Sequence, residues 1–157
     1  MIQIRLAIME DLPVLVAMGR QALEESRYQT FNYDDAKVRK SLEAYLADQR
    51  GKYAILVAVD EGKILGYLFV MAEAYWFCDS VVATNISWFV SPEARGSSAA
   101  TKLVMGFHRW AKNRGVTELK LIVSSAHYIE RTDKMLRRMG FTNIGGNYAL
   151  NLKSNSN

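Results

Sequence analysis

The segment from Trp88 to Ala100 carries the clearest chemical signal in this chain of 157 residues. Its sequence is WFVSPEARGSSAA, in which an apolar stretch ends at a proline and a turn of small residues leads into a helical pattern. Proline interrupts a β-ladder, and small side chains let a ligand approach the backbone. Free amides at a helix N-terminus carry partial positive charge and favour phosphate groups. The pattern therefore predicts a phosphate-binding turn; an ordinary helix start with serine caps is the alternative.

Positive charge is concentrated around this turn. Residues 95–138 hold ten basic and three acidic side chains, whereas the rest of the chain holds ten and thirteen. Such a region suits a polyanionic small molecule, and a nucleic-acid backbone is the alternative partner. The net charge of the whole chain is +4, which alone does not identify a nucleic-acid binder. Charge alone leaves both partners open, and nucleic acid is the less expected of the two.

Strands and helices alternate around the turn and must position it. Period-two patterns predict strands at residues 2–7, 53–59, 64–71, 84–90 and 118–123, and a last hairpin over 141–152. Helical spacing predicts helices from residue 11 to about 23, from 35 to about 46, over 98–114 and over 129–139. Asp34 is the expected cap of the second helix. This order predicts an α/β or α+β fold with helices packed on one sheet, in a single domain over 1–152 followed by a polar tail at 153–157.

Composition excludes several classes of protein. Half of the residues are hydrophobic and 23% are charged, so the chain can form a packed core. One cysteine and two histidines exclude an internal disulfide framework and argue against a metal centre. Residues 1–6 lack the layout of a signal peptide, and no apolar run approaches the roughly 18 residues of a membrane span. We therefore expect a cytoplasmic location, with no metal and no membrane partner.

In this order, the elements and the turn resemble the GNAT superfamily of N-acetyltransferases over nearly the whole chain. In that family a strand ends in Val-x-Pro, followed by Arg or Gln, two residues, Gly, one residue, and Gly or Ala. Residues 90–92, Arg95 and Ala100 match this pattern, whereas Ser98 stands where the family usually has glycine. Gly140-Phe141 also resembles the family's second conserved block. The resemblance implies a central mixed, mostly antiparallel sheet flanked by about four α-helices.

Acetyl-coenzyme A is the co-substrate that the resemblance implies, with an amine as the acetyl acceptor. The backbone of Trp88, Phe89 and Val90 would pair with the pantetheine arm, beside a strand at 121–124 that splays away and contributes Ser124. The amide of Val90 or Phe89 would stabilise the developing oxyanion. The pyrophosphate would be held by Arg95 and by the amides of five following residues, namely Gly96, Ser97, Ser98, Ala99 and Ala100.

The acid and base are less well defined by the resemblance. Many members place a tyrosine four residues before the glycine of the second block, where this chain has Leu136. Tyr128 and Tyr148 are the alternative hydroxyls, and Glu73 is a candidate base acting through a water. A packing or surface role is the alternative for each of them.

The loop at residues 24–33 is expected to shape the acceptor pocket. Its acidic and aromatic side chains suit a cationic amine, with Glu24, Glu25, Tyr28, Phe31 and Tyr33 as candidates. A small polyamine or aminoglycoside, an amino acid and a protein amino group all remain possible acceptors. The resemblance implies a homodimer. The alternative function is a GNAT-fold module without turnover that binds coenzyme A or a macromolecular partner.

Overall fold

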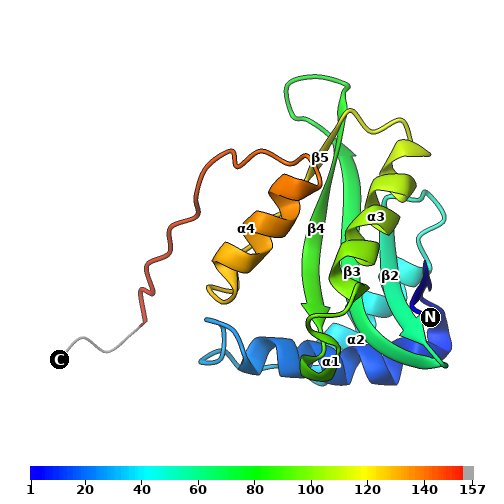
Figure 1. The fold of residues 1–157 in the computed structure, drawn as a ribbon, viewed down its shortest axis with the longest axis vertical. Coiled ribbons are helices and arrows are strands. Elements are labelled where there is room, and N and C mark those ends of the chain that lie inside the picture. Colours follow the sequence, from blue (N-terminus) through cyan, green and yellow to red (C-terminus); the bar gives the residue numbers. More distant parts are fainter. Residues whose placement is uncertain (154–157) are drawn as a thin grey trace.

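A five-stranded sheet in the spatial order β1-β2-β3-β4-β5 forms the centre of the computed structural model, which describes residues 1–153 (Figure 1). Neighbouring strands run antiparallel except β4 and β5, which run parallel. The fold class predicted from the sequence is thus confirmed: a mixed, mostly antiparallel sheet with four α-helices. Residues 154–157 of the predicted tail lie outside the described residues. The strands are β1 Gln3–Leu6, β2 Tyr53–Asp60, β3 Lys63–Ala74, β4 Val81–Val90 and β5 Glu118–Lys120.

Helices cover both faces of the sheet, because β2 and β3 bury side chains on both sides. Ile55 and Val57 pack in a cluster with α1 and α2, whereas Leu56 and Ala58 pack against α3. Asp34 caps α2 as predicted, its Oδ1 accepting a hydrogen bond from the Lys37 amide (3.0 Å). The helices are α1 Leu12–Glu24, α2 Asp35–Leu46, α3 Ala99–Lys112 and α4 Ile129–Arg138, with short 3-10 turns η1 Met9–Asp11 and η2 Pro92–Ala94.

The sheet opens between β4 and β5. Their ladder pairs only residues 82–84 with 118–120. Just beyond it, the side chain of Asn85 accepts from the Ile122 amide (2.7 Å) and donates to the Ile122 carbonyl oxygen (3.0 Å). A β-bulge at Ile86 bends β4 at the same level. The two strands therefore diverge beyond this point, as the family resemblance implies, and the strand predicted at 118–123 ends at Lys120.

The predicted terminal hairpin over 141–152 is wrong. The structure has no strand in residues 141–153, which leave the end of α4 as an extended arm (Figure 1). The alternating pattern that predicted the hairpin is present, but two strands in isolation are only marginally stable in water. We define residues 141–153 as the C-terminal arm.

Candidate active site

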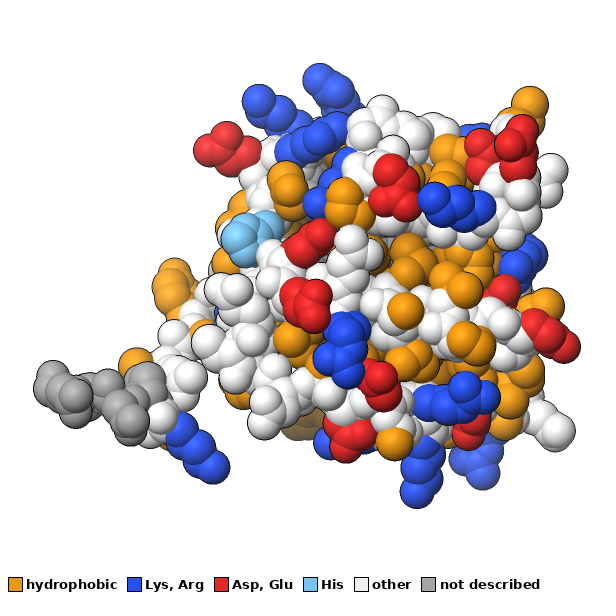
Figure 2. All heavy atoms as spheres, turned by 90° about the horizontal axis from the view of Figure 1, so that it is seen from below, with side chains coloured by type: hydrophobic (Ala, Val, Ile, Leu, Met, Phe, Trp, Pro, Cys, Tyr) orange, Lys and Arg blue, Asp and Glu red, His pale blue; other side chains and the backbone are white. Residues whose placement is uncertain are grey.

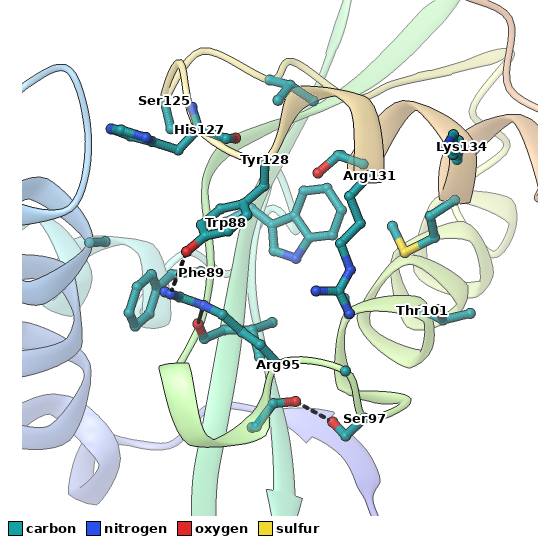
Figure 3. A pocket seen from close by; sticks show the side chains of 18 of the residues that line it. Trp88, Phe89, Arg95, Ser97, Thr101, Ser125, His127, Tyr128, Arg131 and Lys134 are labelled. Carbon is teal, nitrogen blue, oxygen red and sulfur yellow. Dashed lines mark hydrogen bonds between the residues drawn. The ribbon is translucent and has the colours of Figure 1, made fainter.

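A cavity of about 640 Å³ lies where β4 and β5 part (Figure 3). The end of β4 forms its floor, and the turn predicted to bind phosphate forms one side. The C-terminal end of α1 and one face of α4 border other sides, and the cavity is open to solvent. Lining residues include Glu25, Trp88, Phe89, Val90, Arg95, Gly96, Ser97, Ala100, His127, Tyr128, Arg131, Lys134 and Arg138.

The turn before α3 leaves a defined set of amides free. Gly96 has φ +89°, a conformation that side chains disfavour, so a glycine is required for this turn. The Ser97 amide already donates to the Ala94 carbonyl oxygen (3.2 Å), and the Ala99 amide donates to Ser97 Oγ (3.2 Å). Of the five amides predicted from the sequence, those of Gly96, Ser98 and Ala100 thus remain for a ligand within the described residues.

The backbone of β4 shows which amide faces the cavity. The Ser91 amide donates to the Leu65 carbonyl oxygen of the β3 side (2.9 Å). The Phe89 carbonyl oxygen also faces β3, only 2.7 Å from where a Cβ on Gly66 would lie. Backbone groups alternate along a strand, so the N–H and C=O of Val90 point to the open edge. The Phe89 side chain is buried in the core.

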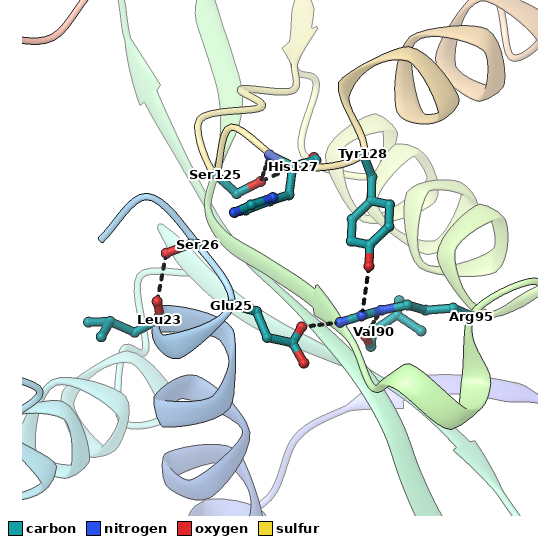
Figure 4. Close-up of polar contacts among 8 residues, drawn as sticks. All are labelled: Leu23, Glu25, Ser26, Val90, Arg95, Ser125, His127 and Tyr128. Carbon is teal, nitrogen blue, oxygen red and sulfur yellow. Dashed lines mark hydrogen bonds and ion pairs between the residues drawn. The ribbon is translucent and has the colours of Figure 1, made fainter. Parts of the chain in front are cut away.

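Arg95 spans the cavity (Figure 4). Its Nε donates to the carbonyl oxygen of Val90 (3.1 Å), its Nη2 pairs with Glu25, and its Nη1 donates to the Tyr128 hydroxyl oxygen (3.4 Å). The guanidinium also lies against the rings of Phe89 (5.5 Å) and Tyr128 (5.2 Å). One side chain thus joins β4, the end of α1 and the start of α4, with its positive charge on the cavity.

Helix α4 adds a basic face that the sequence analysis did not single out. Arg131, Lys134 and Arg138 are spaced three and four residues apart, so they share one side of the helix and line the cavity. A Cβ on Gly96 would lie 3.6 Å from an Arg131 guanidinium nitrogen, which places this cation beside the turn. The surplus of basic residues over 95–138 indicates a positively charged region. Only the packing of α4 shows which of these side chains line the cavity.

Two of the predicted catalytic residues do not reach the cavity. Glu73 pairs with Val82, eight positions before Val90 on β4 and so roughly 26 Å away along the strand. There it forms an ion pair with Lys52 (3.2 Å). Tyr148 lies on the C-terminal arm with its side chain 99% exposed. Of the three candidates, only Tyr128 lines the cavity.

The predicted acceptor residues are dispersed. The Tyr33 hydroxyl donates to the Val16 carbonyl oxygen (2.8 Å), and burial raises its pKa, which fits a packing role. The Tyr28 hydroxyl donates to Ser124 Oγ (3.3 Å), and both residues line a neighbouring groove instead. Glu24 and Phe31 are exposed and do not line the cavity.

Glu25, the residue after Glu24, supplies the cavity's carboxylate. The sequence predicts the loop but not which of its two adjacent glutamates turns inward, because that depends on where α1 ends.

Within residues 1–153 no helix has the length and hydropathy that a membrane crossing requires. The same part of the chain holds no cluster of three or more histidine, cysteine or acidic side chains arranged to ligate a metal.

Comparison with known proteins gives a consistent result. The profile of the acetyltransferase (GNAT) family matches residues 20–141. A solved transcriptional regulator from Bacillus halodurans C-125 has a TM-score of 0.79 at 20% identity, covering 97% of this chain and 100% of that chain. AAC(6')-Iy, solved in complex with the bisubstrate analog CoA-S-monomethyl-acetylneamine, has a TM-score of 0.75 at 20% identity, covering 98% of this chain and 99% of that chain. No curated protein matches the sequence.

Proposed function

Since the chain belongs to the acetyltransferase (GNAT) family, we propose that it transfers an acetyl group from acetyl-coenzyme A to a primary amine. The observation that carries the proposal is the meeting of three features in one cavity. These are the free amides of the turn, the basic face of α4 and the open edge of β4 at Val90. Together they offer donors for phosphates and a strand edge for an extended, amide-bearing ligand.

The residues present fit coenzyme A. The amides of Gly96, Ser98 and Ala100 would hold the pyrophosphate, with the charges of Arg131 and Lys134 nearby. Ser98 replaces the family's glycine without blocking the turn, because its side chain is small and exposed. The Trp88 indole lines the cavity, and its buried Nε1 has no hydrogen-bond partner among the described residues.

When bound, acetyl-coenzyme A supplies an acyl group activated as a thioester. The Val90 amide on the open edge would stabilise the negative charge that develops on the carbonyl oxygen. The bond from Arg95 engages the carbonyl of Val90 and leaves this N–H free. Of the two donors that the sequence left open, Val90 and Phe89, this orientation of the strand supports Val90.

Tyr128 is the proposed proton donor to the leaving thiolate. Its hydroxyl oxygen accepts a hydrogen bond from Arg95, so its own proton remains available. Its backbone is held at φ +55°, a disfavoured conformation of the kind that proteins retain at functional sites. The position that carries a tyrosine in many relatives is Leu136, which is buried here.

Glu25 is the proposed contact for the acceptor. It is the only carboxylate among the described residues that line the cavity, and its side chain is 34% exposed. A cationic amine can pair with it in place of the Arg95 guanidinium. The amine must lose a proton to solvent before its nitrogen forms the C–N bond, while the C–S bond of the thioester breaks and the thiolate takes the proton of Tyr128. Aminoglycoside acetyltransferases occur among the structural neighbours, and at the identities found they support the fold alone.

The test is release of free coenzyme A from acetyl-coenzyme A in the presence of aminoglycosides, polyamines, amino acids and lysine peptides. We expect amine-dependent release with at least one class, and loss of that release in Glu25→Gln. Binding of acetyl-coenzyme A without release for any amine would instead favour the module without turnover.

A further inference from the structure

Helix α4 is joined to the body of the protein by few apolar contacts. Leu136 is its only buried residue, and neither core cluster of residues 1–153 includes a residue of α4. Helix α3, by contrast, buries seven residues and packs in the cluster on its side of the sheet. Elements with few buried apolar contacts open at a low cost in free energy. Packing therefore holds α4 only weakly in the position beside the turn that the structure shows, which we define as the docked position.

The chain is fastened to the body up to Ser125 and is strained directly after it. The Arg27 amide donates to the Ser125 carbonyl oxygen (2.9 Å). Ala126 and Tyr128 then adopt φ +65° and +55°, a left-handed conformation that side chains disfavour. Strained residues at the end of an element can absorb a change in backbone angles. Rotation at residues 126–128 would thus move α4 as one body.

The chain after α4 is not fastened to the sheet. Gly140 has φ +94°, and residues 141–153 beyond it form no strand. The C-terminal arm extends away from the body in two perpendicular views (Figures 1 and 2). Neither flanking segment therefore holds α4 rigidly against the sheet.

Like charges face each other across the cavity. Its single carboxylate among the described residues, Glu25, is already paired with a cation. Within residues 1–153, no ion pair or hydrogen bond joins the three side chains on the basic face of α4 to another residue. The N-terminal end of α3, which carries partial positive charge, borders the same space. Without an anion, repulsion therefore opposes the docked position. The four cations that line the cavity are Arg95, Arg131, Lys134 and Arg138.

We propose that α4 is a lid that a polyanionic ligand closes. In the free protein, repulsion and weak packing let α4 swing away from the turn about residues 126–128 and 139–140. Phosphate groups at the turn would lie beside the basic face, because a Cβ on Gly96 would be only 3.6 Å from an Arg131 guanidinium nitrogen. Their negative charge turns the repulsion into attraction and holds α4 in the docked position. The identity of the ligand as coenzyme A rests on the proposed function, whereas the hinge and the charges do not.

The lid would also control when the proposed proton donor is in place. Tyr128 directly precedes α4, and its hydroxyl oxygen accepts a hydrogen bond from Arg95 (3.4 Å) in the docked position. When α4 swings away about Ala126, this hydroxyl leaves the open edge of β4. Closure by bound phosphates would therefore complete the site only after the cofactor has bound.

Double electron–electron resonance measures the position of α4 directly. In a Cys78→Ser background, one spin label is attached at Arg137→Cys on α4 and the other at Glu61→Cys on the β2–β3 turn. Both positions are exposed, and neither lines the cavity. We expect a broad distance distribution in the free protein at low salt, and one narrow distance with saturating coenzyme A or inorganic pyrophosphate. KCl alone should narrow the distribution in part, because it screens the repulsion.

A Lys134→Gln variant separates the repulsion from ligand binding. Loss of one cation should shift the free protein toward the docked position and at the same time raise the Kd for coenzyme A about tenfold. Arg109→Gln is the matched control: Arg109 is exposed on α3 and does not line the cavity, so this change should affect neither quantity. A Lys134→Gln variant with an unchanged free-protein distribution would contradict the repulsion.

Two outcomes distinguish the lid from the proposed function. Coenzyme A that binds in calorimetry without narrowing the distance distribution would overturn the lid and leave the cofactor site in place. Closure of α4 by coenzyme A without amine-dependent release in the acetyl-transfer assay would support the lid and count against acetyl transfer.

Discussion

Arg95 Nε donates a hydrogen bond to the carbonyl oxygen of Val90, the residue whose N–H also points to the open edge of β4. The guanidinium is held in place by Glu25 and by the Tyr128 hydroxyl. The cation is thus fixed within the cavity next to the strand edge where the thioester is proposed to bind. This arrangement makes Arg95 a link between the cofactor side and the acceptor side of the site.

Replacing Arg95 should therefore affect both sides of the reaction. We expect Arg95→Ala to lower kcat/KM for acetyl-coenzyme A and for the amine, each by about tenfold to a hundredfold, as for loss of one or two charge-assisted hydrogen bonds. Arg95→Lys should recover little, since an ammonium cannot reproduce the fork of contacts. Steady-state kinetics with each substrate varied in turn would measure this. If kcat/KM fell for acetyl-coenzyme A alone, the contact of Glu25 with the amine would not depend on Arg95.

The basic face of α4 should bind the cofactor phosphates. We expect Arg131→Ala to raise the Kd for acetyl-coenzyme A about tenfold, or about 1.4 kcal/mol, measured by calorimetry. Arg137→Ala is the matched control, because Arg137 lies on the same helix, pairs with Asp133 (2.8 Å) and does not line the cavity. Equal effects of both changes would mean that the general charge of α4, rather than this face, binds the ligand.

A substitution at Gly96 tests whether the turn binds the cofactor phosphates. Gly96→Glu brings negative charge to the free amides and forces a side chain into a left-handed conformation. A ligand at a hundredfold excess over its Kd should stabilise the unmodified protein by about 2.7 kcal/mol, raising Tm by several degrees. We expect this shift with acetyl-coenzyme A and coenzyme A, a smaller one with ATP, and none in the variant. An unchanged shift in Gly96→Glu would remove the phosphate assignment.

Tyr128→Phe should separate binding from turnover. Loss of the proton donor should lower kcat about a hundredfold with the Kd for acetyl-coenzyme A unchanged. Tyr75→Phe provides the control, since Tyr75 follows directly after β3, at the far end of the sheet, and donates to Glu118 (2.6 Å). Equal kcat in the two variants would indicate that solvent protonates the thiolate.

The interaction of Asp11 with Arg5 should make the free energy of unfolding decrease at acid pH. Hydrogen bonds from Arg5 (2.7 and 3.0 Å) hold the pKa of the Asp11 carboxyl below its usual value, with a further bond from the Ile8 amide. Because the folded pKa is the lower one, this stabilisation is complete well above the unfolded pKa of about 3.9 and is lost as pH falls toward the folded pKa. Asp11→Asn should therefore cost about 2 kcal/mol at pH 7 in urea unfolding. The difference from the unmodified protein should shrink below pH 4; a constant difference would contradict the assignment.

Local patterns predicted much of the fold and part of the site. The β2–β3 hairpin, α3 and the turn at Gly96 depend on neighbours in the sequence, so alternation, helical spacing and glycine identified them, while phosphate binding by the turn stays a prediction. The terminal hairpin was wrong because residues 141–152 alternate but form no ladder in the structure, and two strands in isolation are only marginally stable. Arg131 was missed, and Glu25 could not be preferred over Glu24, because the inward orientation of these side chains depends on how α1 and α4 dock, which no local pattern encodes.

Asn85 holds the opening of the sheet through hydrogen bonds within the chain itself. Its side chain replaces the lost ladder bonds of Ile122, so the parted strands leave neither of this residue's backbone groups unpaired. A ligand that enters the cavity would then meet strands β4 and β5 already apart and would not have to separate them. The Ile122 amide should accordingly be protected from hydrogen exchange before any ligand is added. An Asn85→Ala variant would lose that protection. It would also bind acetyl-coenzyme A more weakly, because part of the binding free energy would be spent on ordering the strands.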